Sequence, residues 1–348
     1  MRTCDDSAGD PRIIRLDRSD LATARAMYAV EAAAMRAADP QNPPWSEHVF
    51  TVRLTTGQSP AFPPGEAWYV PGDAPGRVAG WYKLALPDLE NRDRAETDLM
   101  VHPAAQRRGL GTALLRHAAG RAAANDRAFL NGIVPQGSAA QAFFGKAGAT
   151  FGVQDVMRVL DLDALPAGHL AACRDDAARA AAGYSVVTWA GRTPDEHLAG
   201  MAALFTTMND APDRPGWEPD VWDERRIRER LDARLEAYGS RGYVTAALCD
   251  ATGEMAAMSE LRVDADRPQW GWQGNTAVTR PHRGHRLGLL VKAAMLEFLA
   301  EAEPGVRKIT TFNATVNDHM IAINEALGFT TCGPPRLETE LPVAAVLA

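Results

Sequence analysis

Two six-residue stretches at matching places in the chain decide the fold. Residues 106–111 read QRRGLG, and residues 283–288 read RGHRLG. A short apolar run precedes each stretch and apolar residues recur every four positions after it, which predicts a strand, a glycine-rich turn and an amphipathic helix. The stretches align without a gap at an offset of 177 residues, from 106 to 283, about half of the 348 residues. The chain is therefore predicted to contain one unit twice.

The elements on either side of the turns repeat in the same order. Opening strands are expected at 13–16 and 186–189, each followed by a helix, and a hairpin follows in both halves. A strand and a glycine-ended helix come after each turn. The order predicts two domains of the α/β class, each built on a mixed sheet.

The predicted domains cover 11–162 and 184–345, joined by a linker at 163–183 that is rich in alanine and aspartate. Two proline-rich stretches, 40–64 and 210–219, are interpreted as surface loops near a binding cleft.

Composition narrows the class of protein. Hydrophobic residues make up 46% of the chain and charged residues 23%, as in folded globular proteins. The formal charge of −7 argues against a nucleic-acid partner. No apolar run reaches the roughly 18 residues of a membrane span and no signal peptide is evident, so we expect a cytoplasmic protein without a membrane partner. The four cysteines are dispersed, so no metal site is expected.

A glycine-rich turn at the start of a helix has a specific chemistry. Its free backbone N–H groups and the positive helix end suit a pyrophosphate. Gly109 and Gly111 lack Cβ atoms, so a phosphate can approach the backbone closely. We expect Gln106 and Arg283 to brace the two turns.

This constellation resembles motif A of the GNAT superfamily, Q/R-x-x-G-x-G/A, which Gln106-x-x-Gly109-x-Gly111 matches in full. Residues 317–329 resemble the two ends of that family's motif B, whereas 138–149 keep only its spacing and Gly148. The resemblance implies two tandem acyl-CoA N-acyltransferase domains with acetyl-CoA or another acyl-CoA as the cofactor. The arrangement is also similar to the mycothiol synthase group of tandem GNATs, in which the C-terminal unit is the working one. The residues placed at the cofactor are Val101, Gln106, Arg107, Arg108, Gly109, Leu110, Gly111 and Thr112 in the first copy, and Val278, Arg283, Gly284, His285, Arg286, Leu287, Gly288, Asn313 and Asn317 in the second.

The second copy departs from the motif because Arg286 replaces the first glycine, although Gly288 is kept. The arginine would either crowd the phosphate loop or grip a phosphate as a bidentate donor. Asn313 and Asn317 are also open to two interpretations. Both could pair with the amide-rich pantetheine arm, or Asn317 could cap its helix.

Acyl transfer to an amine needs a base, a stabilised oxyanion and a proton for the thiolate. The family's acid tyrosine is absent from both copies, where Phe144 and Asn324 take its position. Glu96 is a candidate base in the first copy, and Glu260 on the preceding strand is the candidate in the second. The alternative for each is an exposed strand carboxylate without a catalytic role.

These patterns predict an N-acetyltransferase that acts on a small amine, with the C-terminal copy catalytic and the other mainly structural. The net charge, with Asp210 and Asp213 in the expected acceptor loop, favours a cationic acceptor. The rivals are an O-acyltransferase or decarboxylase that uses acyl-CoA, and a non-catalytic acyl-CoA-binding protein. Acyl chain length and oligomeric state stay open.

Overall fold

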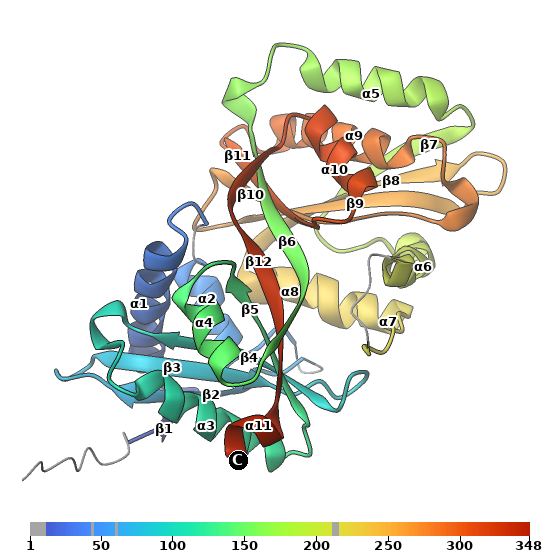
Figure 1. The fold of residues 1–348 in the computed structure, drawn as a ribbon. Coiled ribbons are helices and arrows are strands. Elements are labelled where there is room, and N and C mark those ends of the chain that lie inside the picture. The colour runs from blue at the N-terminus through green and yellow to red at the C-terminus, as the bar shows by residue number, and fades with distance from the viewer. Residues whose placement is uncertain (1–11, 43–44, 60–61, 211–215) are drawn as a thin grey trace, which may run out of the picture. The chain divides into compact units, whose positions relative to one another are not determined.

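The computed structural model describes residues 12–42, 45–59, 62–210 and 216–348, which form two compact units (Figure 1). The first unit contains the residues up to 55, 64–151 and 338–348. The second contains 56–63 and 152–337. No helix among the described residues is both long and apolar enough to cross a bilayer.

The first unit is a mixed sheet with helices on both faces. Its strands lie in the order β1-β2-β3-β4-β5-β12; β1 to β4 are antiparallel neighbours and β4 pairs with β5 in parallel. The strands are β1 (Ile14–Arg15), β2 (Glu66–Pro71), β3 (Val78–Ala85), β4 (Arg94–Val101), β5 (Phe129–Pro135) and the end of β12 (Thr330–Pro342). The helices are α1 (Leu21–Ala38), α2 (Glu47–Thr55), η1 (Pro103–Ala105), α3 (Leu110–Ala123), α4 (Ala139–Lys146) and α11 (Val343–Leu347).

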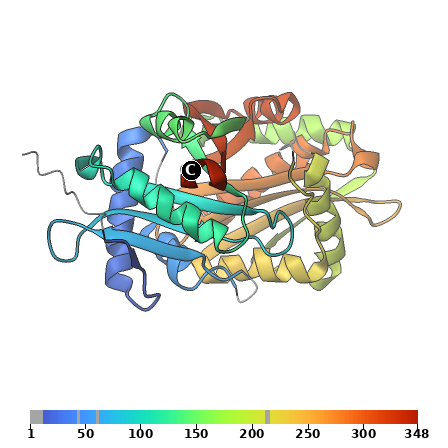
Figure 2. The ribbon, with the colours of Figure 1, turned by 60° about the horizontal axis from the view of Figure 1, so that its bottom comes forward.

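Successive side chains of β3 point to opposite faces of this sheet, so the strand shows which helices cover each face. A Cβ at Gly80 would lie 3.1 Å from Leu114 of α3, so this position faces α3. The next residue, Trp81, packs edge-on against Phe50 of α2 with ring centroids 5.3 Å apart. Figure 2 shows α3 lying across the strands. Odd-numbered residues of β3, Lys83 among them, therefore face α1 and α2.

The second unit repeats this architecture. Its strands lie in the order β12-β6-β11-β10-β9-β8-β7, with β10 and β11 parallel and β6 antiparallel to β11. They are β6 (Thr150–Asp161), β7 (Tyr184–Ala190), β8 (Ser240–Cys249), β9 (Met255–Asp264), β10 (Trp270–Val278) and β11 (Lys308–Ala314). The helices are η2 (Leu162–Ala164), α5 (His169–Ala180), η3 (Asp195–His197), α6 (Leu198–Thr207), η4 (Met208–Asp210), α7 (Glu224–Arg226), the π-helix η5 (Ile227–Asp232), α8 (Ala233–Tyr238), η6 (Arg280–His282), α9 (Leu287–Ala302) and α10 (Asp318–Ala326).

The parallel strands of each unit pair over only three residues. β4 pairs with β5 from Arg94 to Glu96, and β10 pairs with β11 from Trp270 to Trp272. Beyond these points the paired register ends while β4 and β10 continue toward their glycine-rich turns. Each unit therefore has unpaired backbone groups along one strand next to a helix N-terminus.

The structure differs from the sequence-based prediction in three segments. The predicted linker, 163–183, contains α5, which packs against α9. The predicted surface loop at 40–64 contains α2, whose buried face includes Phe50 and Leu54. The last strands are exchanged between the units, because β6 belongs to the second unit and the end of β12 to the first. As limits of the two sequence repeats, 11–162 and 184–345 stay a prediction.

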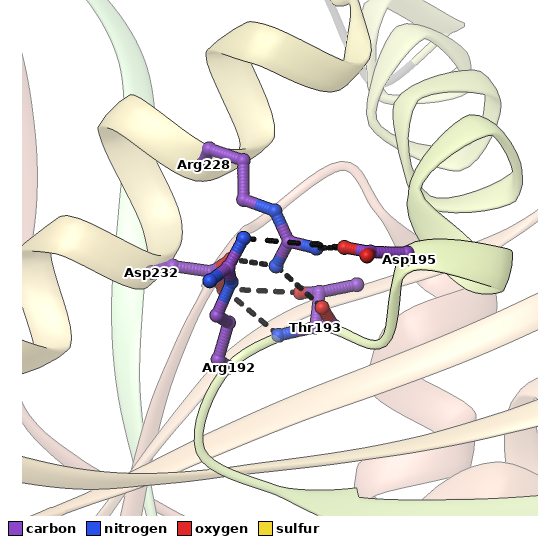
Figure 3. Close-up of polar contacts among 5 residues, drawn as sticks. All are labelled: Arg192, Thr193, Asp195, Arg228 and Asp232. Carbon is purple, nitrogen blue, oxygen red and sulfur yellow. Dashed lines mark hydrogen bonds and ion pairs between the residues drawn. The ribbon is translucent and has the colours of Figure 1, made fainter.

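A buried polar network holds the π-helix against the connection between β7 and α6 (Figure 3). Asp232 accepts hydrogen bonds from the backbone N–H and the hydroxyl of Thr193, both at 3.1 Å. Arg228 pairs with Asp232 at 2.6 Å and also with Asp195, while Arg192 lies 3.9 Å from Asp195. This network fixes the helical segment that packs beside β8 and β9.

Candidate functional site

The two glycine-rich turns have the same backbone shape, but glycine and arginine stand in the opposite order at their two left-handed positions. In the first turn Arg107 and Gly109 adopt left-handed φ angles of 63° and 82°. In the second, Gly284 and Arg286 adopt φ angles of 89° and 55° at the matching positions. Each turn therefore needs two left-handed residues and supplies one glycine and one arginine. The arginine at 286 takes the conformation of Gly109 without changing the turn.

Both turns are braced as the sequence predicts. Gln106 donates a side-chain hydrogen bond to the carbonyl of Val101 at 3.2 Å, and Arg283 donates one to the carbonyl of Val278 at 3.2 Å. A Cβ at Gly109 would meet no atom within 4 Å. The first N–H groups of α3 and α9 have no partner inside the helix, so each turn is suited to an anion.

The Arg286 side chain points to the helix α5 in this structure. Its guanidinium lies 2.5 Å from the carboxylate of Asp176. The ion pair joins the turn to α5. Gly288 lets Ile323 of α10 pack closely, since a Cβ there would lie 3.0 Å from that side chain.

Glu260 lies beside the point where β10 and β11 part. Its Oε1 accepts hydrogen bonds from the backbone N–H of Asn275 at 3.1 Å and from the Asn275 side chain at 3.0 Å. The register of β9 and β10 shifts here between Gln273 and Thr276, which forms a bulge. A Cβ at Gly274 would lie 2.5 Å from Oε1, so glycine makes room for the carboxylate. Glu260 therefore anchors the bulge through one oxygen, and Oε2 takes no part in these bonds.

Asn324 and Asn313 are brought together in the second unit. Asn324 is fully buried, and its Nδ2 donates to Oδ1 of Asn313 at 2.6 Å. Its Oδ1 is buried without a hydrogen-bond partner among the described residues. Asn317 accepts from the backbone N–H of Met320 at 3.2 Å, which confirms its role as a helix cap. The unpaired Asn324 oxygen is a hydrogen-bond acceptor that a ligand N–H group could satisfy.

The first unit is different at the corresponding places. Phe144 is buried at the position of Asn324 and has no polar atom. Glu96 is exposed on β4, whereas Asp98, two residues on and on the same face, enters a cluster of charges. Asp98 lies 3.1 Å from Arg53 of α2 and 3.8 Å from Nζ of Lys83. Burial acts to raise the pKa of Asp98, but the two cations more than offset it and the pKa is lowered.

Glu31 of α1 completes this cluster and was not foreseen from the sequence. Its side chain is 4% exposed and has no hydrogen-bond or ion-pair partner among the described residues. Burial, with a smaller contribution from Asp98, raises the pKa of Glu31 to about 7 against the opposing effects of Arg53 and Lys83. Burial also lowers the pKa of Lys83, and the neighbouring Arg53 lowers it further. The sequence held one signal that Glu31 is buried: it shares the apolar helix face of Ala24, Met27 and Val30.

Asp210 has local counterions that the sequence did not predict. Arg280 binds both of its oxygens, at 2.8 and 2.5 Å, and Arg283 binds one at 2.7 Å. These hydrogen bonds lower the pKa of Asp210 to about 2. Its charge is therefore compensated, and Asp213, the second acidic residue of the expected acceptor loop, lies outside the described residues.

Comparisons with known proteins find similar acetyltransferases. The Acetyltransferase (GNAT) family matches residues 26–149. A mycothiol acetyltransferase from Mycobacterium avium (strain 104) is 28% identical over 274 residues, covering 75% of this chain and 78% of the relative. A tandem GNAT protein from the clavulanic acid biosynthesis pathway is 29% identical with a TM-score of 0.75, covering 95% of this chain and 98% of that one. A GCN5-related N-acetyltransferase from Sphaerobacter thermophilus, 17% identical with a TM-score of 0.65, is similar in fold.

Proposed function

We propose that this chain is a tandem member of the GNAT superfamily of N-acetyltransferases and that its second unit transfers an acetyl group from acetyl-CoA to a small cationic amine. The observation that carries the choice of unit is the buried, unpaired Oδ1 of Asn324. It occupies the position of the family's acid tyrosine, and Phe144 in the first unit offers no polar atom there.

Glu260 is the proposed base of this reaction. Two hydrogen bonds from Asn275 hold Oε1 in place beside the parting of β10 and β11, and Oε2 would accept the amine proton directly or through a water. Asn324 cannot release a proton at ordinary pH, so it would orient a water that protonates the thiolate. Such an indirect route contributes less rate than a true general acid.

Both turns would bind the pyrophosphate of the acyl-CoA. Support comes from their shared backbone shape, the side-chain braces and the exposed helix N-termini. Acetyl as the acyl group is part of the proposal, as is a cytoplasmic location.

A cationic acceptor is proposed from the net charge of −7, since opposite charges raise encounter rates. Asp210 adds little to this argument because Arg280 and Arg283 compensate its charge. Turnover with a cationic amine should fall as ionic strength rises, because salt screens the attraction. A preference for an anionic acceptor would contradict this part of the proposal.

Release of free thiol from acetyl-CoA tests the function. The full-length protein is mixed with acetyl-CoA and, in turn, with cationic amines, neutral amines and matched alcohols, and thiol is measured over time. Release with an amine supports N-acetylation, and release with the alcohol alone supports O-acylation. Release without any acceptor indicates hydrolysis of the thioester. CoA binding without release in any mixture would identify a binding protein and overturn the proposal.

A further inference from the structure

The charged cluster of the first unit surrounds the side-chain amine of Lys83. Lys83 projects from β3 toward α1 and α2, directly opposite Asp98 on β4. Its side chain is only 16% exposed, and its charged neighbours come from three elements: Glu31 of α1, Arg53 of α2, and both Asp98 and Glu96 of β4. Burial and the guanidinium disfavour the charged amine, whereas the three carboxylates favour it; burial is the largest effect, and the pKa of Lys83 is lowered.

We propose that Lys83 is acetylated by acetyl-CoA bound at the first turn, so that the first unit carries a self-modification site. The inference rests on the proposed use of acetyl-CoA by that turn. It goes beyond the transfer to an external amine, which is assigned to the second unit.

The surroundings of Lys83 are those of an activated amine nucleophile. Desolvation and a neighbouring cation both favour the neutral form of a lysine, and a neutral amine is the form that attacks a carbonyl carbon. Arg53 supplies the neighbouring cation, and the packed helices α1 and α2 supply the desolvation. Asp98 holds Nζ in place at 3.8 Å.

Glu31 is the proposed proton acceptor. Its carboxyl group is buried without a partner among the described residues, yet it lies close enough to Lys83 for each to shift the other's protonation. A buried carboxyl group that titrates near neutral pH can take a proton from an ammonium group whose own affinity for protons is reduced. Because no ion pair joins these two described side chains, the proton would pass from Lys83 to Glu31 through one intervening water.

The cluster also lies next to the point where the pairing of β4 with β5 ends. Pairing of β4 with β5 ends at Glu96, and Asp98 is two residues further along β4 on the face that holds the cluster. The same strand runs on to Val101 and the turn with Gly109. Acyl-CoA anchored at this turn and extending along β4 would pass the carboxylate that holds Lys83.

The atoms balance in one transfer. Lys83 gives a proton to Glu31 through the intervening water, and the neutral Nζ attacks the thioester carbon. A C–N bond forms, the C–S bond breaks, and the thiolate leaves and takes up one proton. The second proton lost from Nζ supplies this one, so the products are an acetylated lysine and free CoA.

The second unit provides a natural contrast. At the matching positions, 177 residues on, it has Met208 in place of Glu31 and Glu260 in place of Lys83. It has no amine to acetylate there and no second buried carboxyl group to take the proton. Self-acetylation at this site is therefore specific to the first unit.

The chain has only four lysines, so acetylation can be measured at each of them separately. The wild-type protein is incubated with acetyl-CoA, and acetylation of every lysine is followed by peptide mass spectrometry over time. Lys83 should be modified first, while the exposed Lys146 and Lys308 report background reaction with the reagent. The rate at Lys83 should rise with pH through about 7, as Glu31 loses its proton. Equal or faster labelling of the two exposed lysines would overturn the proposal.

Variants separate guided transfer from background. Glu31→Gln should slow acetylation of Lys83 by about a hundredfold, as for a lost general base, and remove its rise with pH. Gly109→Trp should abolish it by blocking the turn, whereas Glu260→Gln in the second unit should leave it unchanged. Thermal melts of each variant check that it is folded. Acetylation of Lys83 that persists in folded Gly109→Trp would refute the guided reaction.

Failure of the inference can be told from failure of the proposed function. CoA binding and thiol release with an external amine are measured in the same samples. If both occur while Lys83 stays unmodified, the inference alone is wrong. If neither occurs, the proposed function fails and the inference falls with it.

Discussion

Position 83 of the first unit is a lysine, and the matching position 260 of the second is a glutamate. The backbone around them is shared, since β3 and β9 both begin a hairpin with a strand that leads to a glycine-rich turn. Lys83 is held by a cross-strand aspartate, whereas Glu260 is held by the amides of a bulge. The same framework thus carries an amine in one copy and a carboxylate in the other, so the two copies offer different chemical groups at one position.

The largest expected effect concerns a buried lysine that has no counterpart in the first unit. Lys292 of α9 is 1% exposed and contacts the ring of Phe329, while the matching residue of α3 is Leu115. Burial lowers the pKa of Lys292 to about 7. Lys292→Leu should therefore stabilise the protein by roughly 3–5 kcal/mol at pH 7 and below.

The sign follows from the protonation states. The unfolded lysine stays charged up to its usual pKa of about 10.5, whereas the folded one loses its proton near pH 7. The penalty is complete below pH 7 and fades as the pH rises toward about 10.5. Urea melts of both proteins from pH 6 to pH 10 measure this. A stability difference independent of pH would contradict the assignment, and Leu115→Met serves as a control that keeps an apolar residue.

The second prediction compares the candidate bases of the two units, Glu260 and Glu96. Glu260→Gln should lower turnover with an external amine by about a hundredfold, the scale of a lost general base. Glu96→Gln should do little, because Glu96 is exposed on β4. Steady-state thiol release gives the turnover, and CoA affinity is measured separately. The reverse pattern would move the external reaction to the first unit.

The third prediction exchanges the left-handed residues of the two turns. Gly109→Ala should destabilise the first unit by about 1 kcal/mol, because a side chain is strained at a φ angle of 82°. Arg286→Gly should be more stable than Arg286→Ala by a similar amount, since both lose the ion pair to Asp176 and only glycine relieves the strain. Calorimetry of the three variants provides the numbers. Equal stability of the two Arg286 variants would show that this position carries no strain.

The smallest expected effect is at Asp210. Two arginines lower its pKa to about 2, so its pairing stabilises the fold at neutral pH and is lost as the pH falls through that value. Asp210→Asn should have a slightly lower melting temperature than the wild type at pH 7, with the gap closing between about pH 5 and pH 2. Melting curves at several pH values decide this. A gap that widens in acid would contradict the sign.

Local spacing made the turns and their braces predictable from the sequence. Gln106 and Arg283 lie five residues beyond the carbonyl groups that they bind, so the contact depends only on a short segment. The flanking strands and helices followed from alternation and four-residue spacing. Asn317 was also within reach, because a helix cap is a contact three residues long.

Contacts between distant segments could not be predicted in this way. The pairing of Arg286 with Asp176 depends on where α5 packs, and α5 was expected to be a linker. Glu31 and Lys83 lie on separate elements and enter one cluster only because α1 packs on β3. The Glu260 bulge depends on a register shift that no residue pattern marked.

The exchanged end of β12 has a consequence for synthesis on the ribosome. Glu338–Ala348 belongs to the first unit, where Val343 donates its backbone N–H to the carbonyl of Ala128 and Asn131 binds the carbonyl of Thr339. During synthesis the first unit therefore stays incomplete, with the edge of β5 unpaired, until residues 152–337 of the second unit have been translated. An exposed strand edge invites pairing with other chains, so this interval is the stage at which chaperones would be most needed.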